Sequence, residues 1–301
     1  MANTVNYVTR FEKELRQQYS RELCTDGLTT QNISFVNAKT VKIPYITLGG
    51  YKDHSRNGGF NRQSAANEYM TKELEHDRDV EFFVDTMDVD ESNEALSAAN
   101  ITTVFEKEHA IPETDAYRIS KLYSEFEDAG GTVDNTVLSI ENILTTFDKW
   151  METMDDAEVP LDGRILYVTP AINTMIKQAD KITRILDVSA QRSIDRRVRS
   201  LDEVAIRTVP SGRMKSAYDF TDGFTPAEDA VQVNMILVHP SALIACDKHS
   251  YINLWAPGSH TGGDGYLYQN RKYGDLFLLN TRKDGVMINA DAAEDDPEVG
   301  G

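Results

Sequence analysis

The stretch from Leu48 to Arg62, LGGYKDHSRNGGFNR, combines two glycine pairs with three Lys or Arg side chains. Glycine-rich backbone beside positive charge can hold a phosphate group, because free N–H groups and cations both attract anions. A P-loop needs Lys-Ser or Lys-Thr after its last glycine, and a dinucleotide-binding turn needs three glycines at fixed spacing directly after a strand. Neither pattern is present. The alternative interpretation is the flexible tip of a long hairpin that reaches another molecule.

The other reactive residue types do not form a catalytic or metal-binding pattern. The six histidines are scattered, and Cys24 and Cys246 lack metal-ligand or redox spacing. Ser241 in VHPSALI lacks the glycines of a nucleophile elbow. The acidic run DTMDVDES, from Asp85 to Ser92, lacks the ligand spacing of an EF-hand loop and suits helix capping equally well. We therefore predict no cofactor, no metal and no enzyme activity.

The most basic stretch of the chain is SAQRSIDRRVRS, with Arg192, Arg196, Arg197 and Arg199. Such a stretch can contact phosphate, contact an acidic neighbour, or form a solvated face. The chain carries 31 Lys and Arg against 49 Asp and Glu, a net charge of -18. This field opposes the approach of nucleic acid, so we favour the carboxylates of a neighbouring subunit and expect no sequence-specific DNA binding.

Composition is that of a water-soluble globular chain. The 301 residues are 40% hydrophobic and 27% charged, which is enough for a sizeable core. No apolar run approaches the roughly 20 residues that span a bilayer, and the N-terminus has no apolar signal region. We expect a chain that is made in the cytoplasm and has no membrane partner.

The first half of the chain must position the glycine-rich stretch. The segments 39–48 (KTVKIPYITL) and 79–89 (DVEFFVDTMDV) are typical of strands, and the polar residues between them predict an unusually long connection. A helix is expected to start at a Ser92 cap and to end at Pro112. A second runs from about Glu113 to Gly130-Gly131. A third helix is predicted from a stripe of apolar residues, namely Val137, Ile140, Leu144, Phe147 and Met151.

The second half alternates short strands with helices and turns. Strands are predicted in 163–170, 203–210, 231–240, 251–257 and 266–279, with helices in 172–182 and 241–246. Lys283-Asp284-Gly285 indicates a hairpin turn. The acidic tail 290–301 is typical of disorder.

The order of these parts resembles the major capsid protein of tailed bacteriophages, a family with the Hong Kong 97 fold. The motifs that carry the resemblance are DRDVEFFVDTMDVDESN (77–93), RILYVTPAINTMIK (164–177), AIRTVPSGRM (205–214), NMILVHPSALIA (234–245) and GYLYQNRKYGDLFLLNTRKDGV (265–286). Each is weak alone, but together they follow the order of the family.

The resemblance implies an α+β Hong Kong 97-like fold. Its segments would be an N-terminal arm (1–38), an extended hairpin called the E-loop with its flanking strands (39–86), a peripheral domain with a long spine helix (87–132), a mixed α/β axial domain (133–262), peripheral return strands (263–290) and an acidic tail (291–301). Intersubunit contacts are then expected at the E-loop residues Lys52, Arg56, Gly58, Gly59 and Arg62, and at Arg192, Arg196, Arg197 and Arg199.

The resemblance also implies a function. The chain would self-assemble as pentamers and hexamers into the icosahedral shell of a virion in the host cytoplasm, enclosing double-stranded DNA without reading its sequence. Expected partners are a portal and a separate scaffolding protein, because the first E-loop strand begins near residue 40. Some members crosslink an E-loop Lys to an Asn, for which Lys52 with Asn280 or Asn289 are the candidates. The alternatives are an encapsulin-type nanocompartment shell and a cytoplasmic α/β enzyme that binds an anionic substrate at the glycine-rich stretch.

Overall fold

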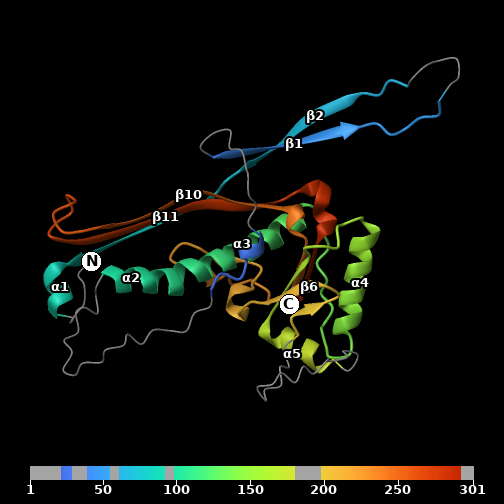
Figure 1. Ribbon diagram of the computed structural model, residues 1–301. Helices are drawn as coiled ribbons and strands as arrows, with labels where there is room; N and C mark the ends of the chain where they lie inside the picture. The colour runs from blue at the N-terminus through green and yellow to red at the C-terminus, as the bar shows by residue number, and fades with distance from the viewer. Residues whose placement is uncertain (1–21, 29–38, 55–60, 92–97, 180–197, 293–301) are drawn as a thin grey trace, which may run out of the picture.

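The computed structural model describes residues 22–28, 39–54, 61–91, 98–179 and 198–292. These residues form a long, thin platform, a compact α/β body at one end of it, and a two-stranded hairpin that projects away from both (Figure 1). The described strands belong to four sheets, of two, three, five and two strands. None of the described helices is long and apolar enough to span a membrane.

The platform is a three-stranded antiparallel sheet that lies along a helix. Its strand order is β10–β11–β3, with bounds Leu243–Trp255, Gly265–Leu278 and His76–Asp85. The central strand β11 pairs over most of its length with both neighbours, so that Asn270 lies opposite Ile252 on one side and Val80 on the other. The strand predicted around 79–89 is therefore confirmed, although its last residues form the short helix α1, Thr86–Glu91.

The helix under the platform corrects the prediction that Pro112 ends a helix. Helix α2 (Ala98–Phe105), a π-helical turn η2 (Glu106–Ala110) and α3 (Ile111–Asp128) follow one another without a break. Pro112 lies in the first turn of α3, directly after the π-helical turn. The preceding π turn shifts the ladder, because Ile111 N–H donates to the carbonyl of Glu106. The predicted cap at Ser92 lies outside the described residues.

The C-terminus of α3 falls where the glycines predicted it. Gly130 adopts a φ of +74°, a left-handed conformation that glycine allows without strain. A Cβ on Gly131 would come within 2.5 Å of the Phe126 ring. Both positions therefore favour glycine, and the chain turns there toward the α/β body.

The α/β body is built on a five-stranded sheet with the order β12–β9–β4–β6–β5. The bounds of its strands are Val286–Ala290, Val233–Val238, Ile165–Val168, Val204–Thr208 and Ser200–Leu201. Helices α4 (Ile143–Asp156) and α5 (Pro170–Gln178) pack on one face through Met235 and Leu237. The other face, with Ile236 and Val238, joins the core of α3 and the adjoining ends of β10 and β11. Strand β9 thus contributes alternate side chains to two hydrophobic cores, one on each face of the sheet.

Helix α4 begins later than its predicted apolar stripe. Val137 and Ile140 are 85% and 43% exposed, and the buried stripe is instead Ile143, Phe147, Trp150 and Met154. The segment before α4 is hydrogen-bonded to strand β12. Asp134 N–H donates to Ile288 O at 2.9 Å, and Ala290 N–H donates to Asp134 O at 3.2 Å. Pairing with the edge of β12 holds this segment out of the helix.

The C-terminal half corrects two further predictions. Only Pro240–Ala242 of the segment 241–246 is helical, as the short turn η4, and the remainder begins β10. Asn280–Gly285 form the 3₁₀ element η5, after which β12 pairs with β9 and not with β11, so Lys283–Gly285 is no hairpin turn. The chain therefore changes sheets near residue 243, where β10 begins, and again near residue 280, before β12.

The projecting hairpin consists of β1 (Thr40–Leu48) and β2 (Ala65–Glu73). The first strand was predicted, but β2 (AANEYMTKE) has no alternating apolar pattern and was not singled out. The remaining short elements are η1 (Asp26–Leu28), η3 (Ser211–Arg213), β7 (Tyr218–Asp219) and β8 (Thr225–Pro226). The last two pair with each other as a small antiparallel hairpin.

Candidate functional site

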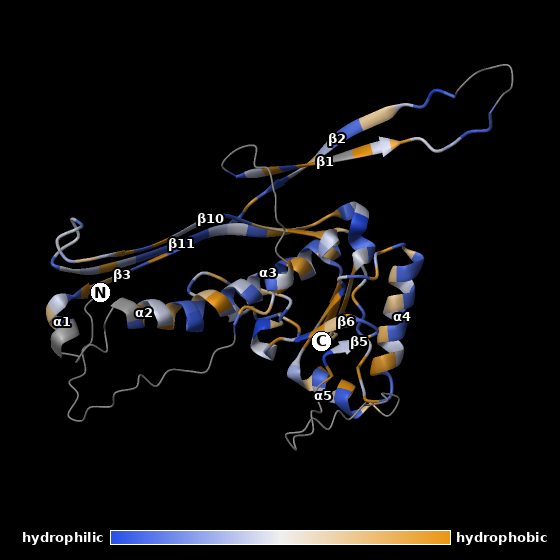
Figure 2. Cartoon of the chain, viewed as in Figure 1, coloured by the Kyte–Doolittle hydropathy of each residue, from blue (hydrophilic) through white to orange (hydrophobic). Residues whose placement is uncertain are grey.

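The projecting hairpin is the candidate functional site, because three of its large hydrophobic side chains are exposed. The two strands pair from Thr40–Glu73 at the base to Leu48–Ala65 near the tip. Ile46 is 66% exposed, Leu48 70% and Tyr69 58%. Figure 2 shows hydrophobic segments on both strands of the projecting part. A two-stranded ribbon with exposed apolar groups is marginal by itself and indicates a surface that another molecule covers.

The tip of the hairpin is held by side-chain amides. Asn61 Nδ2 donates to Asp53 O at 2.9 Å, and Gln63 Nε2 donates to Gly50 O at 3.0 Å. Lys52 and Arg62 are both exposed, as the sequence interpretation requires. No wall encloses them, so an enzyme site for an anionic substrate has little support in the described part of the tip. The other predicted contact residues here, Arg56, Gly58 and Gly59, lie outside the described residues.

The base of the hairpin is anchored in an apolar cluster of its own. Val41 and Leu74 are 1% and 4% exposed and pack with Cys246 of β10 and Phe277 of β11. Leu74 N–H also donates to Lys39 O at 2.8 Å, which closes the base of the ribbon. The hairpin therefore leaves the platform from a packed root and not from a loose joint.

Carboxylates on α3 and β11 reinforce this root. Glu125, which is buried, accepts from Lys72 Nζ at 2.8 Å and from Leu278 N–H at 3.3 Å. Asp275 accepts from Glu75 N–H at 2.9 Å and from the Tyr117 hydroxyl at 2.7 Å. Burial is the main cause that raises the pKa of Asp275 above its ordinary value. The direction of the hairpin is thus tied to the helix under the platform.

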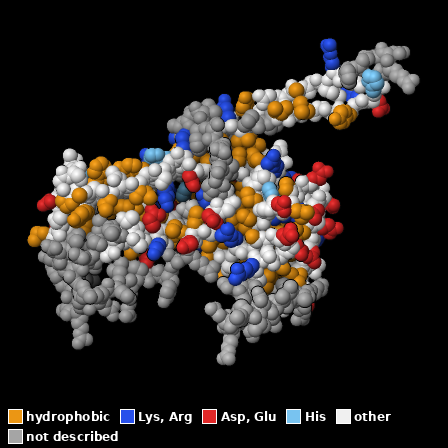
Figure 3. Space-filling view, in the orientation of Figure 1, with side chains coloured by type: hydrophobic (Ala, Val, Ile, Leu, Met, Phe, Trp, Pro, Cys, Tyr) orange, Lys and Arg blue, Asp and Glu red, His pale blue; other side chains and the backbone are white. Residues whose placement is uncertain are grey.

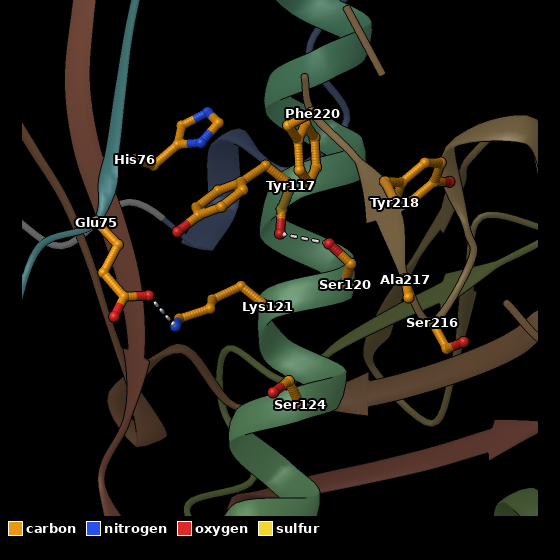
Figure 4. Close-up of a pocket in the computed structure, with 10 residues that line it drawn as sticks. All are labelled: Glu75, His76, Tyr117, Ser120, Lys121, Ser124, Ser216, Ala217, Tyr218 and Phe220. Atoms are coloured by element: carbon orange, nitrogen blue, oxygen red, sulfur yellow. Dashed lines mark hydrogen bonds and ion pairs between the residues drawn. The ribbon is translucent and has the colours of Figure 1, made fainter. Parts of the chain in front are cut away.

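An open hollow of about 280 Å³ lies beside the root, between β3, α3 and the β7–β8 hairpin (Figure 4). His76 stacks on Tyr117 with ring centroids 3.7 Å apart, and Phe220 meets both rings edge-on. Lys121 Nζ lies 3.5 Å from Glu75 across the hollow. Burial, together with the nearby Arg78, lowers the pKa of His76 to about 4. These groups contact one another, and the hollow is best explained as a junction between platform and body.

Arg78 extends this junction. Its Nε lies 2.7 Å from Glu113 Oε1, and its guanidinium also donates to the carbonyls of Phe220 and Gly223. The pair ties strand β3 to α3, and the carbonyl contacts tie both to the β7–β8 hairpin. The junction is therefore held by charge as well as by aromatic packing.

A second anchor, at Asp115 of α3, holds the first described segment of the chain. The buried Asp115 carboxylate accepts from the backbone N–H groups of Cys24 and Thr25 at 3.0–3.1 Å and from the Thr25 hydroxyl at 2.8 Å. Arg213 of η3 donates to the same carboxylate at 3.0 Å. No sequence motif signals this convergence, because its members lie far apart along the chain.

The predicted basic stretch is described only at its end. Arg199 is exposed and directly precedes β5, and its carbonyl accepts from Ile206 N–H at 3.0 Å. Arg192, Arg196 and Arg197 lie outside the described residues. The structure does not bring Arg199 together with the hairpin residues in one site.

Two weaker candidates from the sequence, the acidic run at Asp85 and the motif at Ser241, cap short helices. The Asp85 carboxylate accepts from Met87 N–H at 2.8 Å and so caps α1, as the capping interpretation proposed. His239 Nδ1 lies 2.7 Å from Ser241 Oγ and accepts from Ser241 N–H, which caps η4. Among the described residues, no group of three or more His, Cys, Asp and Glu side chains could hold a metal ion.

The candidate acceptors for a Lys52 crosslink differ in access. Asn289 is fully buried, and its amide nitrogen donates to Asp134 O and Thr136 O at 2.8 and 2.9 Å. Asn280 is exposed in η5. Asn289 is therefore an incorrect candidate in this conformation, because a buried amide cannot meet a lysine of another chain.

The structure was compared with protein families, curated proteins and solved structures, and only the solved structures gave matches. No protein-family model and no curated protein matches the sequence. The structure is similar to that of the mature capsid of bacteriophage PhiM1, with a TM-score of 0.70 and 16% identity over 95% of this chain and 92% of that chain. It is also similar to the capsid structure of the cyanophage P-SCSP1u, with a TM-score of 0.64 and 12% identity over 95% and 93%.

A third similar structure comes from Mycobacterium phage Che8, with a TM-score of 0.60 and 14% identity over 94% of this chain and 97% of that chain. Likeness at this identity concerns the fold. The chain therefore has the fold of these phage structures over nearly its whole length. This confirms the prediction of a phage capsid fold.

Proposed function

We propose that the chain is a major capsid protein, which assembles with copies of itself into the icosahedral shell of a tailed bacteriophage and encloses its double-stranded DNA. The observation that carries the proposal is the likeness to the two capsid structures, which covers more than nine-tenths of this chain and of each of them.

The exposed hairpin supports the same proposal. Apolar groups on a ribbon that leaves the body gain cover only when another molecule binds, and a shell supplies that molecule at every position. In the Hong Kong 97 layout, β1 and β2 are the E-loop, α2 to α3 the spine helix of the peripheral domain, and the five-stranded sheet the axial domain. Two sets of residues then make intersubunit contacts, namely Lys52, Arg56, Gly58, Gly59 and Arg62 of the E-loop, and Arg192, Arg196, Arg197 and Arg199 of the basic stretch.

The acidic surface suits a container for DNA. Acidic side chains gather over α4 at one margin of the molecule (Figure 3), and the net charge of the chain is -18. A polyanion gains no release of counterions at such a surface, so DNA is enclosed without adhesion. Pentamers and hexamers of the chain, a portal and a separate scaffolding protein complete the proposed assembly, which carries out no reaction.

The test is expression of the full chain, alone and with the genes beside its own, followed by negative-stain electron microscopy. Closed shells of uniform size are expected. Deletion of Tyr51 to Arg62 should leave a folded subunit, since the root of the hairpin is packed independently, but should prevent closed shells. A chain that remains a compact monomer under all conditions would contradict the proposed function, and normal shells from the deletion would contradict the role of the tip.

A further inference from the structure

We infer that the free edge of strand β10, residues 249–255, pairs with the same edge of a second copy of this chain. The two strands lie antiparallel about a twofold axis at Asn253 and join two platform sheets into one. This inference rests on the proposed self-assembly and adds a contact that involves neither the projecting hairpin nor the basic stretch.

Strand β10 is an edge strand whose outer half has few of the features that keep sheet edges from pairing. In the part of the chain that the structure describes, β10 pairs only with β11, and its outer half lies at the end of the platform away from the α/β body (Figure 1). Exposed edges are commonly blunted by charged side chains, prolines or bulges. The register shift between Asp247 and His249 is followed by HSYINLW, which contains no Asp, Glu, Lys, Arg or Pro. This stretch can therefore accept another strand.

The opposite edge of the same sheet is protected by charge. Strand β3 carries five charged residues, namely Asp77, Arg78, Asp79, Glu81 and Asp85. Pairing of β3 with a second β3 would place carboxylates beside one another, which is destabilising. The edge of the platform that suits pairing is therefore that of β10.

The backbone of β10 shows which groups face outward. Leu254 N–H donates to the side-chain oxygen of Asn253 at 2.9 Å, which indicates that this N–H points away from β11. In an antiparallel ladder every second residue directs its N–H and C=O to the same side, so Ile252 and Ser250 also point outward. These groups need a hydrogen-bond partner, and an antiparallel strand supplies one for each of them.

Exposed apolar side chains lie on both faces of this edge. Ile252 is 51% and Leu254 46% exposed. Both lie on the face of helix α2, because Leu254 is opposite Tyr268, whose ring contacts this helix. Tyr251, which is 38% exposed, lies on the other face together with Trp255. A strand that pairs with this edge therefore covers apolar groups on both sides of the sheet.

Self-pairing about Asn253 matches these side chains with one another. Ile252 comes opposite Leu254 of the second copy, and Tyr251 comes opposite Trp255, each twice because the axis is twofold. Apolar and aromatic cross-strand pairs of this kind stabilise a sheet. Pairing about Ile252 instead would place Leu254 opposite a serine, so the register at Asn253 is favoured.

Charge favours a second copy as the occupant of this edge. The chain has a net charge of -18, so most contacts between two copies must avoid opposing carboxylates. The uncharged edge of β10 meets its own copy without that repulsion. A twofold contact buries the same patch on both subunits, so one edge on each chain is sufficient.

Single cysteines test the twofold axis. Asn253→Cys and Ser250→Cys are prepared in the full chain, and covalent dimers formed under mild oxidation are measured on a non-reducing gel, with the unmodified chain correcting for Cys24 and Cys246. At the axis the two Cα atoms are about 4.5–5.5 Å apart, which suits a disulfide. In particles, dimers of Asn253→Cys should form at least about tenfold faster than those of Ser250→Cys, whose two copies lie about 20 Å apart. Position 250 is the more exposed of the two, so access alone would favour the control.

A pair of charge variants gives an independent readout. In Ile252→Asp with Leu254→Asp, carboxylates face each other between the two copies, and the yield of particles should fall at least about tenfold. In Ile252→Asp with Leu254→Lys, opposite charges face each other, and particles should form. Both side chains are about half exposed in the subunit, so both variants should fold, which circular dichroism of free subunits checks.

Three results would overturn the inference: equal dimer formation at positions 250 and 253, no dimer at 253 in particles, or equal loss of particles from both charge variants. Dimers at 253 that form only after another protein is added would also overturn it, because that protein is then the occupant. If the unmodified chain forms no particles, the proposed function is overturned instead. The same gel on concentrated free subunits then still tests the β10 contact.

Discussion

His76 shows at the scale of one residue how the junction beside the hairpin is held. Its ring stacks on Tyr117 and is mostly buried, and the neighbouring Arg78 disfavours a second positive charge. The His76 pKa of about 4 means that the folded chain keeps this histidine neutral. The other charged groups at this point are Glu113, 4.0 Å from the ring, and Asp77.

The unfolding free energy should therefore fall between pH 7 and pH 5 because of this one group. The unfolded chain binds a proton near the ordinary His pKa of 6.5, while the folded chain does so only near 4, so protons favour the unfolded state in this window. From these two values His76 should remove about 2 kcal/mol of stability between pH 7 and pH 5. Urea unfolding of the wild type and of His76→Phe at both pH values measures this difference. Two pH profiles that run parallel would contradict it.

At the scale of elements, α4 shows how competition between segments sets a helix boundary. The predicted stripe begins at Val137 because its apolar spacing is helical, yet Asp134 is drawn to the edge of β12 by two backbone hydrogen bonds. The helix then starts at Ile143, and its buried stripe rotates to Ile143, Phe147, Trp150 and Met154. Phe147 is common to both stripes, so the prediction and the structure agree on this residue but not on the first turn.

Alanine substitutions along this segment should separate the two stripes. Phe147→Ala should lower the unfolding free energy by about 3–5 kcal/mol, because it opens a cavity between α4 and the five-stranded sheet. Val137→Ala and Ile140→Ala should change it by about 0.5 kcal/mol or less, since both side chains are already exposed. Denaturant unfolding of the three variants is the measurement, and a large loss from Val137→Ala would show that the helix starts earlier.

At the scale of the whole molecule, a few buried charges connect parts that the chain separates. Asp115 joins the segment at Cys24 and Thr25, helix α3 and Arg213 of η3. Glu125 joins the hairpin root at Lys72 to the end of β11. Arg164, whose side chain is fully buried, joins the end of α4 to β4 through Asp155 at 2.7 Å. These contacts fix how the segment 22–28, the hairpin, the platform and the α/β body are placed on one another.

Asp115→Ala should destabilise the whole subunit by about 3–5 kcal/mol, because it removes the acceptor of several bonds and leaves Arg213 without this buried ionic partner. The measurement is the unfolding free energy in urea. Asp148→Ala on the exposed side of α4 serves as the control and should lose about 0.5 kcal/mol or less. A loss below about 1 kcal/mol for Asp115→Ala would show that the anchor is dispensable.

The amino-acid sequence by itself determined those features that depend on neighbouring residues. Local apolar patterns identified β1, β4, β6 and β9, and glycines identified the end of α3. The absence of motif spacing argued against a P-loop. The order of motifs also led to the capsid fold, because a resemblance in order survives when each motif is weak. The exposed positions of Lys52 and Arg62 follow from the same polar stretch.

Only the tertiary structure decided the features that depend on residues far apart. Strand β2 has no apolar period and is a strand because β1 pairs with it. Distant partners also decide that β10 joins the three-stranded sheet and β12 the five-stranded sheet. The same holds for the anchor at Asp115, and no sequence pattern indicated the π turn before Pro112. Local propensity favours helix or strand in each segment, whereas pairing and burial between distant segments decide which side chains remain exposed.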